Sequence, residues 1–559
     1  MQKNKQMQKN KRQNVKNVRS VIRQTVTGYA GLSLGIVLAV AGAIVTALLP
    51  PWILGSIVDT ITAGNAVPVA LVILYFAFTV LTGLTESIRE GLLTVFGQKI
   101  THALRSSMME KYTNLTAGEL TKQEPGTIVS RFVGDVDTVE NLFTSGIISM
   151  FADACKIISI LVVIWLKNSG LAIVLLVLLP FLYWLTRTVQ KNMLKAQIEN
   201  RCAVGRASGH VPETLHNIRT IHTLGKERYM EERYDEYIAE SYRAVDRTNF
   251  YDAIYSPVIL ILNAIVVAVV MLFSASGNAK VLTLFGMSAG TAVAVINYIS
   301  QIFTPVESLG MEIQTIQSAI AGVHRINEFY ALEELPERVR NLETSVAIAE
   351  ETPFVELQNV TFAYEDDSRK ILHHLSFQVH PGEQVTLSGR TGAGKSTVFK
   401  LLLGLYQPGE GKVLIQGRDA FQIPEHEKRS LYGYVEQTFH RVPGTVKDQI
   451  TLYDDSFTME EVRGAARIAG LDATIEQLEK GYDTPCTQEI FSQGQWQLLS
   501  IARAAVAKPK LLLLDEITAN LDAQTEEEVL QALKRASEGR TVISISHRVN
   551  AETGRIITF

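Results

Sequence analysis

The chain has 559 residues, which is too long for a single hydrophobic core, so we expect two or more domains. Its 53 Lys and Arg against 57 Asp and Glu give a formal net charge of −4. No overall basic field attracts nucleic acid, and we expect no nucleic-acid partner. The three cysteines, Cys155, Cys202 and Cys486, lie far apart without CxxC or Cys/His spacing, which argues against a disulfide framework and a zinc site.

The N-terminal tail, residues 1–23, is strongly basic, with eight Lys or Arg and no Asp or Glu. The apolar stretch after it is too long for a secretory signal peptide, and no small-residue cleavage site closes it. Segments rich in Lys and Arg stay on the cytoplasmic side of a membrane. The pattern therefore predicts a cytoplasmic tail before a first membrane span.

Six apolar segments are long enough to cross a bilayer, which takes about 20 residues of helix. They cover 24–58, 60–85, 141–166, 168–186, 253–279 and 281–306. Short links join the first span to the second, the third to the fourth and the fifth to the sixth, and we expect these links on the outer side. The intervening 86–140 and 187–252 are long, charged and helix-patterned, which indicates helices that continue into the cytoplasm.

The second half of the chain has a different pattern. Residues 318–352 are acidic and lack long apolar runs, which is typical of an exposed linker, and from 353 short apolar runs alternate with helical segments. We therefore predict a basic tail (1–23), an all-α six-helix transmembrane domain in the lipid bilayer (24–317), a linker (318–352) and a cytoplasmic α/β P-loop domain (353–559).

A phosphate-binding motif is the strongest chemical signal. Residues 389–397 fit G-x-x-x-x-G-K-[ST], follow a predicted strand and open a helix, so a chance glycine-rich turn is a poor explanation. In such a loop the glycines let backbone N–H groups surround phosphate oxygens, Lys395 meets the β- and γ-phosphates, and Ser396 binds Mg²⁺. The loop residues that we expect to contact ATP are Gly389, Gly392, Gly394, Lys395, Ser396 and Thr397.

Two carboxylates follow the apolar run Leu511 to Leu514. A continuous apolar run is typical of a buried parallel strand, whose carboxyl end faces the ligand in such sheets. We expect Asp515 to hold Mg²⁺ and Glu516 to polarise the attacking water. An acidic strand end is a weak signal alone, but it becomes strong downstream of a phosphate loop.

Between these motifs, residues 491–504 form a short polar loop that runs into an amphipathic helix. Here the sequence resembles the ATP-binding cassette (ABC) family, in which a signature close to Leu-Ser-Gly-Gly-Gln contacts the γ-phosphate of ATP held by the other subunit. The resemblance assigns that role to Ser492, Gly494 and Gln495. It implies an ATPase that works as a dimer with a second ABC half-transporter subunit and uses ATP and Mg²⁺.

Further family marks occur in the expected order. Tyr364 resembles the aromatic that stacks on adenine, and Gln437 resembles the glutamine that senses nucleotide and binds Mg²⁺ with Ser396 and Asp515. Asp522 matches the loop that acts across the dimer, and His547 matches the histidine that holds the γ-phosphate. Taken singly, each has a structural alternative, as a strand aromatic, a turn residue or a surface imidazole.

The resemblance extends to the membrane half. Residues 125–137 are similar to the first intracellular loop of six-span ABC exporters, and residues 213–221 are similar to the second. In the family these loops carry coupling helices that dock on nucleotide domains, one of them on the partner's domain. A solvated amphipathic helix is the competing interpretation for either loop. The implied function is ATP-driven export of a small or amphiphilic substrate across the cytoplasmic membrane. The alternative is a membrane ATP sensor that moves no solute.

Three further features bear on the assembly, the C-terminus and the third span. Gln493 replaces the third-position glycine of the signature, which resembles one member of an asymmetric heterodimer, although a homodimer is also possible. The chain stops at Phe559, twelve residues after His547, before the final elements usual in the family. Asp153 and Lys156 share a face of the third span, where they either line a transport path or neutralise each other.

Overall fold

The computed structural model describes residues 17–274, 288–335, 352–364, 369–517, 521–545 and 554–559. The chain divides into two compact units. Unit 1 comprises Met1–Tyr112 and Pro125–Ala331, and unit 2 comprises Thr113–Glu124 and Leu332–Phe559. The short segment Thr113–Glu124 thus belongs to unit 2, although the chain on both sides of it belongs to unit 1.

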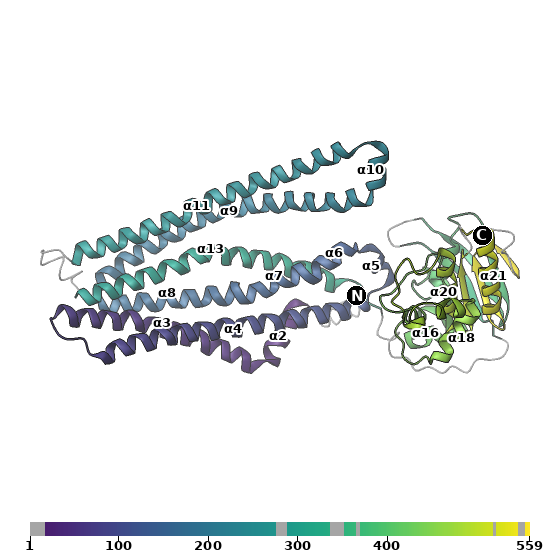
Figure 1. Cartoon of the computed structure of the whole chain (residues 1–559), viewed down its shortest axis with the longest axis horizontal. Helices are drawn as coiled ribbons and strands as arrows, with labels where there is room; N and C mark the ends of the chain where they lie inside the picture. Colours follow the sequence, from purple (N-terminus) through teal and green to yellow (C-terminus); the bar gives the residue numbers. More distant parts are fainter. Residues whose placement is uncertain (1–16, 275–287, 336–351, 365–368, 518–520, 546–553) are drawn as a thin grey trace, which may run out of the picture. The chain divides into compact units, whose positions relative to one another are not determined.

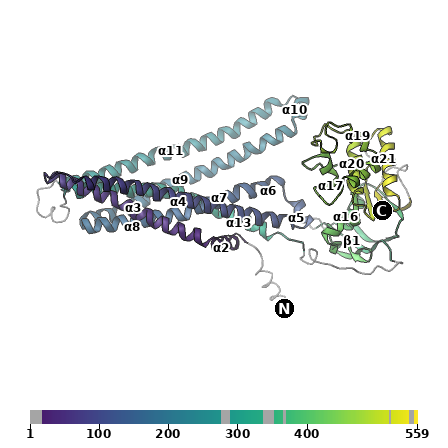
Figure 2. The same ribbon diagram turned by 60° about the horizontal axis from the view of Figure 1, so that its bottom comes forward.

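Unit 1 is built of long helices that run side by side in Figures 1 and 2. Its elements are α2 (Val18–Gly28), α3 (Ala30–Thr62), α4 (Val69–Thr113), α6 (Pro125–Ser130), η1 (Arg131–Asp135), α7 (Val136–Asn141), η2 (Leu142–Gly146), α8 (Ile147–Lys167), α9 (Ser169–His216), α10 (Ile218–Leu224), α11 (Glu227–Ser274) and α13 (Ala289–Ala331). The last residue of α4 lies in unit 2. At about 1.5 Å per residue, the 45 residues of α4 extend far beyond a hydrocarbon core of about 30 Å.

The described parts of the six predicted spans are helical except at Tyr29, at residues 63–68, and at Asn168 and Ser288. Three described stretches are long and apolar enough to cross a membrane, namely Ala30–Thr62, Val69–Thr113 and Pro125–Lys167, and Leu260–Val269 and Ala289–Phe303 are shorter apolar helices. Large apolar side chains on α3 and α4, among them Leu38 and Phe76, are exposed on the protein surface, as contact with lipid requires. The chain is a multi-pass membrane protein.

One difference concerns the first span, which was expected as a single segment from residue 24. The helix breaks at Tyr29, and the preceding α2 is a separate helix whose N-terminus is capped by Asn17. The apolar face of α2 buries Val18 and Val21, and the N–H of Val18 donates to Oδ1 of Asn327 on α13 at 3.0 Å. Contacts with α13 therefore hold α2 in place as a helix separate from the membrane-spanning helix α3.

Two prolines lie inside α3 at positions 50 and 51. Because proline has no N–H, Pro50 leaves the carbonyl of Thr46 without its helical donor. The hydroxyl of Thr82 on α4 donates to this carbonyl at 3.0 Å, and the hydroxyl of Tyr298 on α13 donates to the carbonyl of Leu48 at 2.6 Å. Side chains of two neighbouring helices thus hold the interrupted turn of α3.

Unit 2 contains two sheets. The antiparallel sheet has the order β2 (Leu372–Val379), β1 (Val355–Phe362), β4 (Glu410–Ile415), β5 (Arg418–Asp419). The parallel sheet has the order β6 (Tyr432–Val435), β7 (Leu511–Asp515), β8 (Thr541–Ile545), β3 (Gln384–Ser388), β9 (Arg555–Thr558). The helical elements are α5 (Ala117–Lys122), α15 (Lys395–Leu402), η3 (Ala420–Gln422), α16 (Glu425–Leu431), α17 (Val446–Thr451), α18 (Met459–Ala469), α19 (Asp472–Glu476), η4 (Gly481–Asp483), α20 (Gln493–Ala505) and α21 (Ala523–Ser537).

Strand β7 separates the two hydrophobic cores of unit 2. Leu511 and Leu513 pack into the core formed by the antiparallel sheet and α15, whereas Leu512 and Leu514 pack into the core formed by α18, α20 and α21. Successive side chains of a strand point to opposite faces, so a strand buried on both faces is apolar throughout. This accounts for the unbroken leucine run. The predicted fold classes, an all-helical membrane domain and an α/β nucleotide domain, are confirmed.

Candidate nucleotide site

The predicted site residues meet at one edge of the parallel sheet. Register pairing places Asp515 beside Ile545 and Ile545 beside Leu387, so β3, β7 and β8 end at the same level. On the other side of β7, Val435 pairs with Leu514. The phosphate loop after β3, the carboxylates of β7 and Gln437 after β6 therefore leave the sheet together, as ligand-binding loops do in parallel sheets.

The phosphate loop has the backbone that its glycines allow. Gly389, Gly392 and Gly394 have φ angles of 151°, 84° and 98°, and a Cβ at Gly394 would come within 2.7 Å of Leu372 Cδ2. Lys395, 5% exposed, donates from Nζ to the carbonyls of Gly389 at 2.8 Å and Arg390 at 3.0 Å. Its ammonium thus lies inside the loop, where a phosphate would be bound.

The electrostatics of Lys395 fit a phosphate ligand. Burial lowers the pKa of this ammonium, and the nearby carboxylates of Glu516 and Asp515 counteract the shift. A buried cation is stabilised by an anion that replaces lost hydration. Ser396 is exposed at the start of α15, whereas Thr397 is buried, so the hydroxyl of Ser396 is the accessible oxygen of the pair.

Asp515 and Glu516 lie in different environments. Asp515 accepts a hydrogen bond from the hydroxyl of Tyr434 at 3.3 Å. Burial raises the pKa of Asp515, and the Tyr434 hydrogen bond opposes the rise. Glu516 accepts a hydrogen bond from Nε2 of Gln437 at 3.3 Å, and its φ of 43° is left-handed. Gln437 is in turn held through its carbonyl, which accepts from Nε2 of Gln497 at 2.6 Å.

These oxygens suit magnesium bound together with a nucleotide. Among the described residues no group of three His, Cys, Asp or Glu side chains could hold a metal ion. Mg²⁺ beside phosphates needs only one or two protein oxygens, because phosphate and water supply the other ligands. The hydroxyl of Ser396 and the carboxylate of Asp515 are hard oxygen ligands of this type.

Tyr364 lies between the phosphate-loop helix and α5. Its hydroxyl is 3.3 Å from both Oγ1 of Thr397 and Nζ of Lys400 on α15. Its ring packs edge-on against Tyr406, with centroids 5.3 Å apart, and the hydroxyl of Tyr406 is 3.4 Å from that of Thr121 on α5. The aromatic predicted to contact adenine is therefore connected to α5 through one tyrosine.

Residues 125–137, which resemble the first intracellular loop, form α6, η1 and the start of α7 in unit 1, whereas the preceding segment Thr113–Glu124 belongs to unit 2. The segment Thr113–Glu124 pairs with the residues that follow α13. The N–H of Thr116 donates to the backbone carbonyl of Glu333 at 3.2 Å, and the N–H of Leu335 donates to the backbone carbonyl of Asn114 at 2.8 Å. A local pattern could not reveal this pairing, because the two paired segments lie far apart in the sequence.

The signature residues form the N-terminus of α20. Ser492 caps the helix, and a reciprocal bond joins its N–H to Oε1 of Gln495 at 2.9 Å. Gly494 is buried, whereas Gln493 is exposed. Asp522 caps α21, with its side chain accepting from the N–H of Thr525, but without a reciprocal bond to its own N–H. Among the described residues, no hydrogen bond or ion pair joins 492–495 to the phosphate loop 389–397, as expected if the signature serves another subunit's nucleotide.

Three further predicted residues are His547, Asp153 and Lys156. His547 lies outside the described residues, although β8 ends two residues before it, at the edge where Asp515 and Glu516 lie. Asp153 and Lys156 are both half-buried on α8, and their role stays a prediction.

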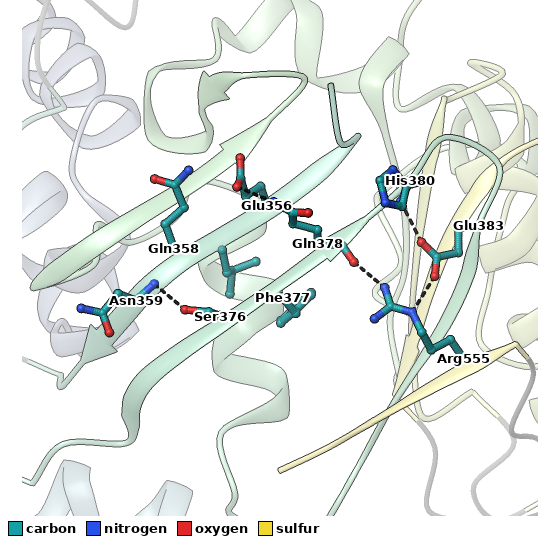
Figure 3. Close-up of a pocket in the computed structure, with 10 residues that line it drawn as sticks. Glu356, Gln358, Asn359, Ser376, Phe377, Gln378, His380, Glu383 and Arg555 are labelled. Carbon is teal, nitrogen blue, oxygen red and sulfur yellow. Dashed lines mark hydrogen bonds and ion pairs between the residues drawn. The ribbon is translucent and has the colours of Figure 1, made fainter. Parts of the chain in front are cut away.

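An open groove of about 700 Å³ lies elsewhere on unit 2, over the antiparallel sheet. Figure 3 shows Arg555 at one end, paired with Glu383 at 2.6 Å, and Asn359 bonded to Ser376 at the other. None of the predicted nucleotide residues lines this groove.

Comparison with known proteins gives the family. The model of the ABC transporter transmembrane region matches residues 32–306, and the ABC transporter model of the ATP-binding domain matches 372–519. A solved structure of a bacterial Atm1-family ABC exporter with ATP bound superposes with a TM-score of 0.76 at 25% identity, over 97% of this chain and 94% of that one.

Relatives of similar length share 29% identity. They include the uncharacterised ABC transporter ATP-binding protein YfiC of Bacillus subtilis, aligned over 97% of this chain and 89% of the relative. An ATM1-type heavy metal exporter of Novosphingobium aromaticivorans aligns over 90% and 83%, and a fatty acid ABC transporter ATP-binding/permease protein of Mycobacterium bovis over 82% and 72%. With both the membrane and the ATP-binding region in one chain, this protein belongs to the ABC transporter family as an exporter-type half-transporter whose ATPase activity is coupled to transport.

Proposed function

We propose that this chain is one half of a dimeric exporter that moves a small or amphiphilic substrate across the cytoplasmic membrane, and that its partner is a different half-transporter. In this arrangement the basic N-terminus and the nucleotide unit lie in the cytoplasm, as the excess of Lys and Arg in residues 1–23 favours. Relatives with the same identity are named for heavy metals and for fatty acids, so the proposal commits to no particular cargo.

The main support is the convergence of Lys395, Asp515, Glu516 and Gln437 at one sheet edge. In the proposed reaction Lys395 and the loop amides bind the triphosphate, and Ser396 and Asp515 hold Mg²⁺, which neutralises phosphate charge when bound. Glu516 orients the attacking water and accepts its proton, and Gln437 keeps the Glu516 carboxylate in place. These roles use positioning and charge, which dominate catalysis of phosphoryl transfer.

The second subunit is proposed because, in the described part of the chain, no hydrogen bond or ion pair joins the signature residues to the phosphate loop. In the proposed dimer, Ser492, Gly494, Gln495 and Asp522 contact the nucleotide of the partner. Helix α10 supports the same arrangement. Ile221 is its one buried residue, while Leu215, Ile218 and Leu224 at this tip are exposed. Exposed apolar clusters are typical of docking surfaces, and the resemblance assigns this loop to a nucleotide domain.

The heterodimer is proposed because an intact set of catalytic residues occurs beside an altered signature. Gln493 is exposed at the first position of α20, so its side chain points away from the core of its own unit and is free to meet the opposing nucleotide. The nucleotide site that this chain's phosphate loop forms would hydrolyse ATP, and the site served by its signature would mainly bind ATP.

The test uses full-length protein in lipid nanodiscs and inside-out vesicles, produced alone and together with a second half-transporter encoded beside it. We expect phosphate release and ATP-dependent uptake of Hoechst 33342 or a fluorescent phospholipid from the pair. Glu516→Gln should remove phosphate release while trinitrophenyl-ATP still binds, and Lys395→Ala should weaken that binding. Glu528→Gln is the matched control, since Glu528 is exposed on α21.

Each part of the proposal has its own contradicting result. Full ATPase and transport by the chain alone would indicate a homodimer. ATPase without movement of any amphiphile, and without stimulation by one, would favour the ATP-sensing regulator. Equal turnover by the wild type and by Glu516→Gln would refute the assigned catalytic residue.

A further inference from the structure

Two helix ends that carry proposed dimer contacts cross at a single point. Helix α20 begins with the signature residues, helix α21 begins directly after Asp522, and the two helices pack against each other. At the crossing, Gly494 of α20 faces Thr525 of α21. A Cβ at Gly494 would lie closer to Cγ2 of Thr525 than the 3.0 Å that real Cβ atoms keep. Gly494 therefore allows the two helix ends to touch.

The same threonine holds Asp522. The hydroxyl of Thr525 donates to Oδ1 of Asp522 at 2.7 Å, and its backbone N–H donates to Oδ2 at 3.2 Å. Asp522 is the cap of α21, so its orientation depends on this hydroxyl. Thr525 thus uses its methyl group to contact the signature helix and its hydroxyl to fix Asp522.

We propose that Thr525 is a positioning residue that joins the signature segment 492–495 and Asp522 into one unit, so that both approach the partner's nucleotide together. The inference rests on the proposed dimer and adds a residue that the sequence motifs do not include. It gives Gly494 a second role besides close approach to phosphate, because a side chain at 494 would disturb α21.

A Cβ at position 494 has two ways to avoid Thr525, and both move Asp522 or the signature. The two helix ends can separate until the atoms reach ordinary contact, which moves the signature relative to Asp522. Alternatively, Thr525 can rotate about χ1 to remove its methyl group, but this rotation also removes the hydroxyl from Asp522. A misplacement of about 1 Å in a reacting site can lower the rate by about 10²-fold.

The Thr525→Ser change removes the obstructing methyl group and retains the hydroxyl. The nearest remaining atoms to a Cβ at 494 are then Cβ of residue 525 at 3.4 Å and its Oγ at 3.7 Å, which is ordinary van der Waals contact. Serine at 525 should therefore accommodate alanine at 494. Thr525→Val makes the opposite change, because it keeps a methyl group against Gly494 and loses the hydroxyl that donates to Asp522, while the backbone N–H donor remains.

The experiment measures kcat and KM for ATP in full-length dimer in nanodiscs, with trinitrophenyl-ATP binding to the phosphate loop as a second readout. We expect Gly494→Ala to lower kcat by at least tenfold with little change in trinitrophenyl-ATP affinity, and Gly494→Ala/Thr525→Ser to recover most of the loss. Thr525→Val should lower kcat several-fold. Gly464→Ala is the matched control, because a Cβ at Gly464 on α18 meets nothing within 4 Å.

The double variant decides the inference. Equal loss in Gly494→Ala and in Gly494→Ala/Thr525→Ser would show that the glycine serves the nucleotide alone, and wild-type kcat in Gly494→Ala would show that the crossing does not position the site. Either result overturns the proposed role of Thr525. Absence of ATPase in both the wild type and Gly464→Ala would instead refute the proposed function.

Discussion

The ion pair between Arg325 and Asp135 ties helix α13 to the segment after α6. Nε of Arg325 lies 3.0 and 2.9 Å from the two carboxylate oxygens of Asp135, and Nη2 lies 2.5 Å from Oδ1. The two side chains differ in environment, since that of Asp135 is 6% exposed and that of Arg325 is 48% exposed. Removing the arginine should therefore cost more than neutralising the aspartate.

The size of this difference follows from the burial of each partner. Arg325→Ala leaves a buried carboxylate without its cation, and breaking a fully buried pair costs about 3–5 kcal/mol. Because Arg325 is half in solvent, we expect roughly 1.5–3 kcal/mol, the range of charged hydrogen bonds. Asp135→Asn leaves an arginine that water can solvate, and we expect about 1 kcal/mol or less.

The assay is the midpoint of thermal unfolding of the detergent-purified protein at one heating rate. About 1 kcal/mol corresponds to roughly 2 °C in a unit of this size, so Arg325→Ala should lower the midpoint by several degrees and Asp135→Asn by two at most. The double variant Arg325→Ala/Asp135→Asn should be more stable than Arg325→Ala, because it leaves no buried charge without a partner. Arg228→Ala, which breaks an exposed pair with Glu232, is the control. Equal losses in the two single variants, or additive losses in the double variant, would refute the reasoning.

Three further predictions concern other contacts. Tyr434→Phe removes a donor that lowers the pKa of Asp515, so this pKa should rise. Because the proposed Mg²⁺ ligand is the ionised carboxylate, the acid limb of the ATPase pH profile should move to higher pH, and an unchanged profile would contradict this. Gly290→Ala places a Cβ against the carbonyl of Gly55 and should destabilise the α3–α13 contact by about 1–3 kcal/mol, which would lower the thermal unfolding midpoint. Gly31→Ala, whose Cβ would meet no atom within 4 Å, should leave the midpoint unchanged. Tyr406→Leu removes the edge-on ring contact with Tyr364, which contributes about 0.5–1.5 kcal/mol, and should raise KM for ATP by about two- to tenfold. Tyr406→Phe keeps the ring and should retain most of the ATP affinity.

The elements that the sequence predicts well are those with a local cause. The leucine run of β7 was read as a buried strand because four successive apolar residues end in two carboxylates, and β7 indeed has a core on each face. The phosphate loop was equally local, since its glycines and Lys395 occur within nine residues. Long apolar helices were predictable for the same reason, because a membrane span is defined by the composition of one continuous segment.

The features that escaped prediction depend on residues far apart in the chain. The break at Tyr29 is supported by the contact of α2 with Asn327, near the end of unit 1. The assignment of Thr113–Glu124 to the nucleotide unit comes from backbone pairing with Glu333 and Leu335. Thr525 shows no motif, and its role appears only when α20 and α21 are packed together.

At Glu516 one feature follows from the local sequence and another depends on contacts with distant residues. Its position after Asp515 was predictable, but its left-handed φ of 43° was not, because a non-glycine residue rarely adopts this conformation. Such a conformation costs about 1–3 kcal/mol and persists only where surrounding contacts impose it. The Glu516 N–H still bonds to the carbonyl of Ile545 at 3.3 Å, while the carboxylate is held by Gln437. The backbone thus continues the ladder of β7 and β8 as the side chain turns to Gln437. An ordinary extended conformation would direct that side chain differently, so the strain at this residue is best explained by the orientation that its proposed role in hydrolysis requires.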